Sequence, residues 1–77
     1  MPIIDTQGGW SVVYREDYAN DQLPWFQMGQ SLNQNEAVAL ARLIFDRDKK
    51  GHVEIRDRDR TARGYFTPSR PEGFFEF

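Results

Sequence analysis

Two periods of apolar residues along the chain predict its secondary structure. Side chains alternate between apolar and polar at residues 10–15, 25–30 and 52–56, and this period of two indicates β-strands. Residues 62–67 are rich in aromatic and β-branched side chains and predict a fourth strand, which Pro68 ends. Between the second and third strands the apolar period changes to that of an α-helix.

The helix has a start signal and a stop signal. Asn33 is a good N-cap, and Glu36 three positions later completes a capping box. Gly51 suits the left-handed residue that commonly follows a helix end. The stripe expected to face the core is Ala37, Leu40, Ala41 and Ile44, widened by Val38 and Phe45.

Strand alternation assigns a face to each side chain. The strand residues expected to point toward the helix are Trp10, Val12, Tyr14, Phe26, Met28, Val53 and Ile55. If the third strand continues into the charged run 56–60, the opposite face carries Glu54, Arg56, Arg58 and Arg60, joined by Trp25 and Tyr65.

The order β-β-α-β-β predicts an α+β fold with two layers, in which one helix packs on a mostly antiparallel four-stranded sheet. If the strands on either side of the helix are parallel, their connection should be a right-handed crossover. Residues 1–77 are expected to form a single domain, with residues 1–9 and 68–77 as flanking segments. The apolar residues Phe74, Phe75 and Phe77 are expected to pack against the sheet or in a partner.

Composition narrows the classes of function. With 77 residues the core is small, and a shallow binding surface is expected rather than a deep cleft. The chain has no cysteine and one histidine, which excludes disulfides, thiolate catalysis and cysteine-ligated zinc. No apolar run approaches a membrane span, and residues 1–5 lack the pattern of a signal peptide. We therefore expect a cytoplasmic protein without a cofactor.

Charge is distributed unevenly along the chain. The net charge is −2, but residues 1–39 carry one cation against five acids, whereas residues 40–77 carry nine cations against seven acids. The arginines concentrate between Arg56 and Arg63. Arginine and tryptophan are common anchors of protein interfaces, so Arg56, Arg58, Arg60 and Trp25 are candidate partner-binding residues.

The same arginines allow other interpretations. Cations interleaved with aromatic rings also suit a nucleic-acid surface, and alternating charges also protect an exposed strand edge from aggregation. A second candidate surface is the acidic loop with Asp17 and Asp21, which could meet a basic partner or be merely solvated. No catalytic signature is present, so an enzyme is not expected.

Residues 46–57 partly match an EF-hand calcium loop. Asp46, Asp48, Gly51 and Val53 fit their positions in that loop. Lys50 places an ammonium where a ligand oxygen is required, and Asp57 is shorter than the usual glutamate. Because the residues that follow lack a helical period, we interpret the stretch as a helix end leading through Gly51 into a strand. A degenerate calcium site remains a third hypothesis.

One family-level resemblance follows from these positions. The pattern Trp10-x-Val12-x-Tyr14, Asn33-x-x-Glu36 and Val53-x-Ile55 resembles small ββαββ proteins of unknown function from bacteria and phages. In size and layout the chain is also similar to phage-encoded anti-CRISPR inhibitors. That group shares no common site, so no functional residue is carried over.

This resemblance implies a non-catalytic inhibitor, borne by a phage or mobile element, that binds a bacterial defence nucleoprotein complex. The alternative is a small nucleic-acid-binding module that uses the arginine and aromatic sheet face. The chain is expected to act as a monomer or homodimer.

Overall fold

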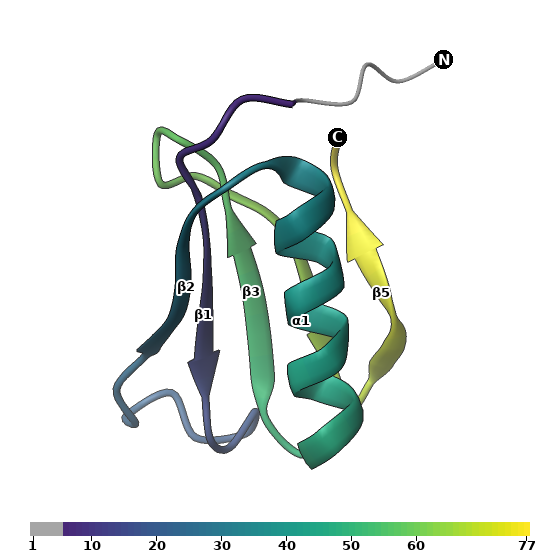
Figure 1. Ribbon diagram of the computed structural model, residues 1–77. Helices are drawn as coiled ribbons and strands as arrows, with labels where there is room; N and C mark the ends of the chain where they lie inside the picture. Colours follow the sequence, from purple (N-terminus) through teal and green to yellow (C-terminus); the bar gives the residue numbers. More distant parts are fainter. Residues whose placement is uncertain (1–5) are drawn as a thin grey trace.

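A computed structural model describes residues 6–77, so residues 1–5, including the stretch assessed for a signal peptide and part of the expected leading segment, lie outside it. The fold is α+β, with one helix packed on a five-stranded antiparallel sheet (Figure 1). The elements are β1 (Trp10–Arg15), β2 (Phe26–Leu32), α1 (Gln34–Asp48), β3 (His52–Arg56), β4 (Ala62–Thr67) and β5 (Arg70–Phe75). No helix in this part of the chain is long and apolar enough to cross a membrane.

The strand order is β2-β1-β3-β4-β5. Since β1 is antiparallel to both β2 and β3, these two outer neighbours run parallel to each other. The chain passes from β2 through α1, in front of the sheet, to β3 on the right, which makes the crossover right-handed (Figure 1). Such a crossover is the rule for parallel strands of one sheet.

The helix begins and ends as its sequence indicates, with one difference. The Asn33 side chain accepts a hydrogen bond from the Glu36 amide, and the Glu36 carboxylate accepts one from the Asn33 amide. The left-handed residue at the helix end is Lys49, not Gly51. Gly51 is required for a different reason, because a Cβ there would collide with the Tyr14 ring and the Arg15 carbonyl.

The core lies between the helix and the middle strands. The fully buried apolar residues of the strands are Val12, Val53, Ile55 and Phe66. The buried helix residues Ala37, Ala41 and Phe45 face them, and the small alanines allow α1 to lie close to the sheet. Trp10 is also buried, and the Phe45 and Phe66 rings stack with centroids 6.0 Å apart. The expected inward positions of β1 and β3 are therefore confirmed.

The prediction for the second strand was wrong. Phe26 and Met28 are about half exposed instead of facing the core, at 45% and 46%. The helix covers only the far part of this edge strand, where a Cβ on Gly29 would collide with Leu40. A β-bulge also interrupts the alternation, because Gln27 and Gly29 pair with the consecutive residues Val13 and Val12.

The predicted four-stranded sheet and the flanking segment 68–77 were also wrong, since β5 pairs with β4. Pro71 is tolerated because β5 is an edge strand with one unpaired side. Gly73 has φ 88°, and a Cβ there would collide with the Phe66 and Phe75 rings. The aromatic C-terminal residues pack against the sheet, with Phe75 on Phe66 and Phe77 on Trp10. Of the two expectations for this segment, packing against the sheet is therefore the one confirmed.

Candidate interaction surface

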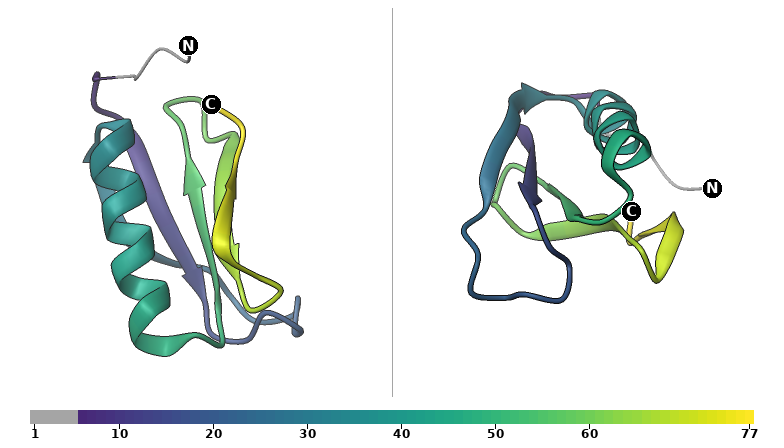
Figure 2. Two further views of the ribbon diagram at one scale, coloured as in Figure 1. Left: turned by 90° about the vertical axis from the view of Figure 1, so that its right-hand side faces the viewer. Right: turned by 90° about the horizontal axis from the view of Figure 1, so that it is seen from below.

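The sheet face that the helix leaves uncovered carries a continuous row of side chains. In the register of the sheet, Gln27, Val13, Glu54, Tyr65 and Phe74 are successive cross-strand neighbours from β2 to β5. Figure 2 shows the helix on one side of the sheet and no helix on the other side. We call this uncovered side the open face. Within the row Val13 is buried, whereas Glu54, Tyr65 and Phe74 are partly exposed.

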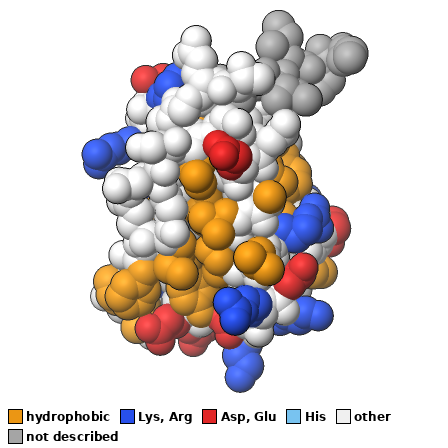
Figure 3. Space-filling view, in the orientation of Figure 1, with side chains coloured by type: hydrophobic (Ala, Val, Ile, Leu, Met, Phe, Trp, Pro, Cys, Tyr) orange, Lys and Arg blue, Asp and Glu red, His pale blue; other side chains and the backbone are white. Residues whose placement is uncertain are grey.

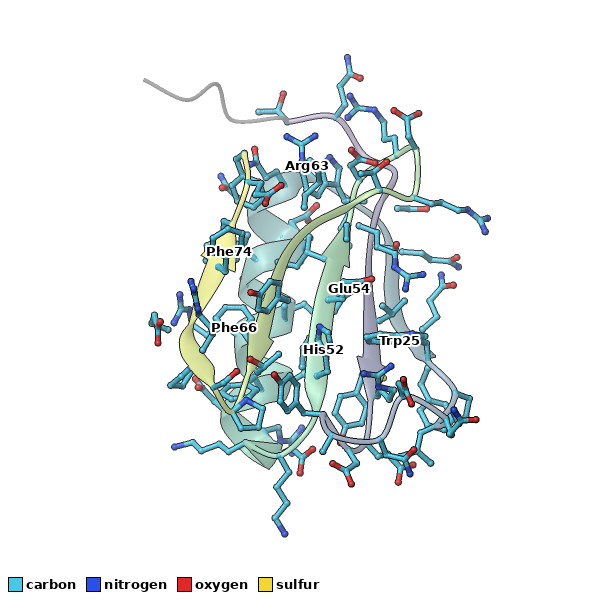
Figure 4. All side chains as sticks on the ribbon, turned by 180° about the vertical axis from the view of Figure 1, so that it is seen from behind. Trp25, His52, Glu54, Arg63, Phe66 and Phe74 are labelled. Atoms are coloured by element: carbon cyan, nitrogen blue, oxygen red, sulfur yellow. The ribbon has the colours of Figure 1, made fainter. Side chains whose placement is uncertain are left out.

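Four rings form a chain of contacts across the open face. Trp25 contacts His52 at 5.0 Å between centroids, His52 contacts Tyr65 at 5.7 Å, and Tyr65 contacts Phe74 at 5.5 Å. Figure 4 shows Trp25, His52 and Phe74 spread across this face. Each pair adds about 0.5–1.5 kcal/mol beyond its buried area. We refer to Trp25, His52, Tyr65 and Phe74 as the aromatic row.

Arginine side chains lie over both ends of the aromatic row. The guanidinium groups of Arg15 and Arg56 lie 4.7 and 5.4 Å from the centre of the Trp25 ring. At the other end, the Arg70 guanidinium lies 5.2 Å from the Phe74 ring centre. Arg56 is also held by Glu54, whose carboxylate accepts from Nε at 2.6 Å. These contacts restrict the orientations of the rings and of the cations.

His52 is one of the two inner members of the aromatic row, and its ring is partly buried. Both ring nitrogens are buried and have no hydrogen-bond partner among the described residues. Burial lowers the pKa of His52 below its ordinary value, and Arg15 and Arg56 lower it further against the opposing effect of Glu54. The lowered pKa favours the neutral imidazole at pH 7, and His52 takes part in the row through the contacts of its ring with Trp25 and Tyr65.

The structure brings together only some of the predicted site residues. Trp25, Arg56 and Tyr65 do share the open face, as strand alternation predicted. Arg58 and Arg60 do not, because β3 ends at Arg56 and the chain turns. Asp57 forms this turn: its Oδ1 accepts from the amides of Asp59 at 2.9 Å and Thr61 at 3.1 Å. The hydrogen bonds of the Asp57 side chain to nearby amides thus end the strand, although the alternating charges of residues 56–60 had suggested that it continues.

The three predicted arginines still meet, at one end of the sheet. Arg56, Arg58 and Arg60 line one cavity of about 250 Å³ beside β1 and β2. The acidic loop lies at the opposite end of the sheet from this turn (Figure 1). In that loop Asp17 accepts from the Ala19 amide, and Asp21 accepts from the Gln22 side chain. The predicted partner-binding residues are therefore divided among the open face, the cavity at one end of the sheet and the acidic loop at the other end.

Sequence reasoning missed Arg15, His52, Arg70 and Phe74 as members of this surface. Alternation along residues 52–56 did contain a signal for His52, since it placed His52, Glu54 and Arg56 on one face. Arg15 also alternates away from the core residues of its strand. Arg70 and Phe74 carried no such signal, because their strand was not predicted.

The residues of the calcium hypothesis are not assembled into a loop. Asp46 and Asp48 lie in the last turn of α1, and Asp57 follows the far end of β3. The Asp48 carboxylate accepts a hydrogen bond from the Tyr14 hydroxyl. Within residues 6–77, no three His, Asp or Glu side chains are grouped so that they could hold a metal ion. The transition from helix to strand near Gly51 is confirmed.

A second exposed surface lies on the helix side. Apolar side chains gather along the middle of this side of the molecule (Figure 3). Val38, Ala39, Leu43 and Phe77 line a shallow groove there, and the Leu43 side chain is 57% exposed. Arg42 and Asp46 also line this groove, and the Arg42 guanidinium lies 5.1 Å from the centre of the Phe66 ring.

Comparison of the chain with protein-family models, with curated proteins and with solved structures found no match, so the resemblance to ββαββ phage proteins and anti-CRISPR inhibitors stays a prediction.

Proposed function

We propose that this protein is a non-catalytic interaction protein that binds a protein partner with its open face. The observation that carries this proposal is the aromatic row with its flanking arginines, which spans the sheet without a covering element. Tryptophan, tyrosine and arginine are the residue types that contribute most binding energy in protein interfaces. Because each ring and each flanking arginine already contacts a neighbouring side chain, its orientation is restricted before binding, and little side-chain entropy is lost when a partner binds.

Two features favour a protein partner over a nucleic acid. Single strands bind by stacking bases on free ring faces, whereas guanidinium groups already lie over the Trp25 and Phe74 rings. In addition, the Glu54 carboxylate lies within the cross-strand row, so a base stacked on the neighbouring Tyr65 ring would meet an acid there. A protein surface can use the same arginines as hydrogen-bond donors without displacing them.

In its most specific form, the proposal is an inhibitor of a bacterial defence nucleoprotein complex. The small size of the chain and a surface rich in arginine and aromatic residues support this form. An interference assay in cells with an active CRISPR system tests it directly. Expression of the chain should restore phage plating, and Tyr65→Ala should reduce this effect at equal protein level. Unchanged interference with the unaltered chain would refute the inhibitor hypothesis and leave the broader proposal standing.

Site-specific photocrosslinking tests the broader proposal. A photoreactive phenylalanine analogue replaces Tyr65 on the open face, and in a matched control it replaces Leu43, which is exposed on the helix. In the source cells, the analogue at position 65 should yield a discrete protein adduct that the control lacks. Adducts that disappear on nuclease treatment would instead support the nucleic-acid alternative. Equal or absent adducts at both positions would contradict an interface on the open face.

A further inference from the structure

A polar cavity lies at the end of the sheet where β3 turns into β4. It measures about 250 Å³, which at roughly 30 Å³ per water accommodates a tetrahedral oxyanion with several waters. Its lining comes from the residues before β1, from β1 and β2, and from the end of β3 with the turn that follows, and it includes Gly9, Ser11, Ser31, Arg56, Asp57 and Arg60. The hydroxyl groups of both serines and the guanidinium groups are potential donors to an anion.

The backbone around this cavity is unusual. The described residues include five with positive φ, and three of them line the cavity: Gly9 at 101°, Ser31 at 58° and Arg60 at 64°. Lys49, another of the five, is explained by its place at the helix end. For non-glycine residues this conformation costs of order 1 kcal/mol, and such residues cluster at ligand sites. Left-handed residues in turns also form the concave nests of N–H groups that bind anions.

The charges of the lining residues leave the cavity cationic. Asp57 is the lining acid, and its Oδ2 accepts from Arg63 at 3.2 Å while Oδ1 accepts two backbone amides. Arg56 uses its Nε for Glu54, so its other two nitrogens remain as donors. Among the described residues, Arg60 forms no ion pair with an acid. The lining thus contains one carboxylate and three arginines, of which Arg56 is paired with Glu54 and Arg58 has a further contact of its own.

We propose that this cavity binds a phosphate-type oxyanion, either inorganic phosphate or the phosphate group of a small phosphomonoester. Guanidinium forks match the oxygens of such an anion in charge and geometry. Ser11 and Ser31 line the same cavity, and their hydroxyl groups suit the remaining oxygens. The cavity borders the open face, because Arg56 belongs to both, but the four rings of the aromatic row are not part of its lining, so phosphate binding can be tested separately from the protein partner.

Nuclear magnetic resonance titration of the full chain tests the site. Inorganic phosphate is added at constant ionic strength, and amide shifts are followed at Gly9, Ser31 and Arg60. We expect saturable shifts at these residues, whereas chloride and acetate should give weaker, unsaturated changes. A titration with ribose 5-phosphate separates the two sources, since tighter binding than inorganic phosphate would identify the phosphomonoester. Absence of saturable shifts with both, or equal binding of acetate, would overturn the proposal.

Matched variants distinguish a specific phosphate site from a general effect of charge. Arg60→Gln should weaken phosphate binding about tenfold, as expected for the loss of one charge-assisted contact. Arg47→Gln removes the same charge from the exposed last turn of the helix and should leave binding unchanged. Ser31→Gly retains the positive φ at no steric cost and removes the hydroxyl, so it should fold and bind more weakly. Equal losses in the Arg47 and Arg60 variants would show general screening of charge and refute a built site.

Discussion

Replacing Tyr14 by phenylalanine removes one hydroxyl that connects β1 to the end of α1. In the folded chain this hydroxyl donates to the Asp48 carboxylate, 34 residues away in sequence. The contact closes the helix end onto the sheet beside Gly51. Without the hydroxyl, the partly buried carboxylate loses a donor at the negative end of the helix dipole, where an acid is unfavourable.

The size of the effect follows from the pKa of Tyr14. The hydrogen bond to Asp48, with burial and the negative charges of Asp48 and Glu16, raises this pKa from 10.0 to about 12. Two pKa units correspond to roughly 2.7 kcal/mol, which is an upper bound, because burial and the two negative charges disfavour the phenolate rather than stabilise the hydroxyl, and solvent screens this partly exposed site. We therefore expect Tyr14→Phe to lower the free energy of unfolding by about 1–2 kcal/mol at pH 7.

The dependence on pH has a definite sign. Because the pKa is raised in the folded state, the contribution is fully present below pH 10 and is lost as pH rises toward 12. The difference in stability between the unaltered chain and Tyr14→Phe should therefore shrink over that window. Urea unfolding followed by circular dichroism at pH 7, 9 and 11 would measure it.

Tyr65→Phe is the matched control, since within the described residues the Tyr65 hydroxyl has no hydrogen-bond partner. A double-mutant cycle with Asp48→Ala should give a coupling energy of about 1 kcal/mol between positions 14 and 48. A coupling energy near zero, or a loss no larger than that of Tyr65→Phe, would refute the reasoning.

Three further substitutions test other parts of the structure. Gly51→Ala should destabilise the fold by about 2–4 kcal/mol in thermal or urea unfolding, because the added methyl group collides with Tyr14 and Arg15, and an unchanged midpoint would contradict the close approach. The unaltered chain should lose stability as pH falls below 6.5, since the lowered pKa of His52 favours the neutral ring in the folded state. His52→Phe should abolish this loss, and identical profiles of stability against pH for the two proteins would exclude a contribution from His52. The pKa of Asp57 is lowered despite desolvation, because its carboxylate accepts hydrogen bonds from Thr61, Asp59 and Arg63. Asp57→Ala should therefore lower the free energy of unfolding by about 1–2 kcal/mol at pH 7, and by progressively less as pH falls through that pKa. A loss that persists in full at pH 2 would disprove this origin.

Strong local signals predicted the helix and four of the strands. The capping box at Asn33 and the alternation of Trp10, Val12 and Tyr14 depend on neighbours in sequence, so they could be recognised before the fold was known. The strand β5 was missed because Pro71 and Gly73 weaken local strand propensity. Pairing with β4 decides that strand, through a partner that a local pattern does not contain.

Some residues of the candidate site were likewise placed correctly by local sequence patterns, and others were not. Alternation placed Trp25, Arg56 and Tyr65 on one face, because side chains of a strand point to opposite sides in turn. It failed for Arg58 and Arg60, where the Asp57 side chain closes a turn and ends the strand.

By itself the sequence determined the elements whose apolar period and caps are local, and the face that each regular strand buries. Tertiary structure decided the fifth strand, the exposure of Phe26 and Met28, the assembly of the aromatic row and the cavity shared by the three arginines. The physical reason is that these features depend on contacts between residues far apart in the chain, and a local pattern does not specify which distant partner each side chain meets.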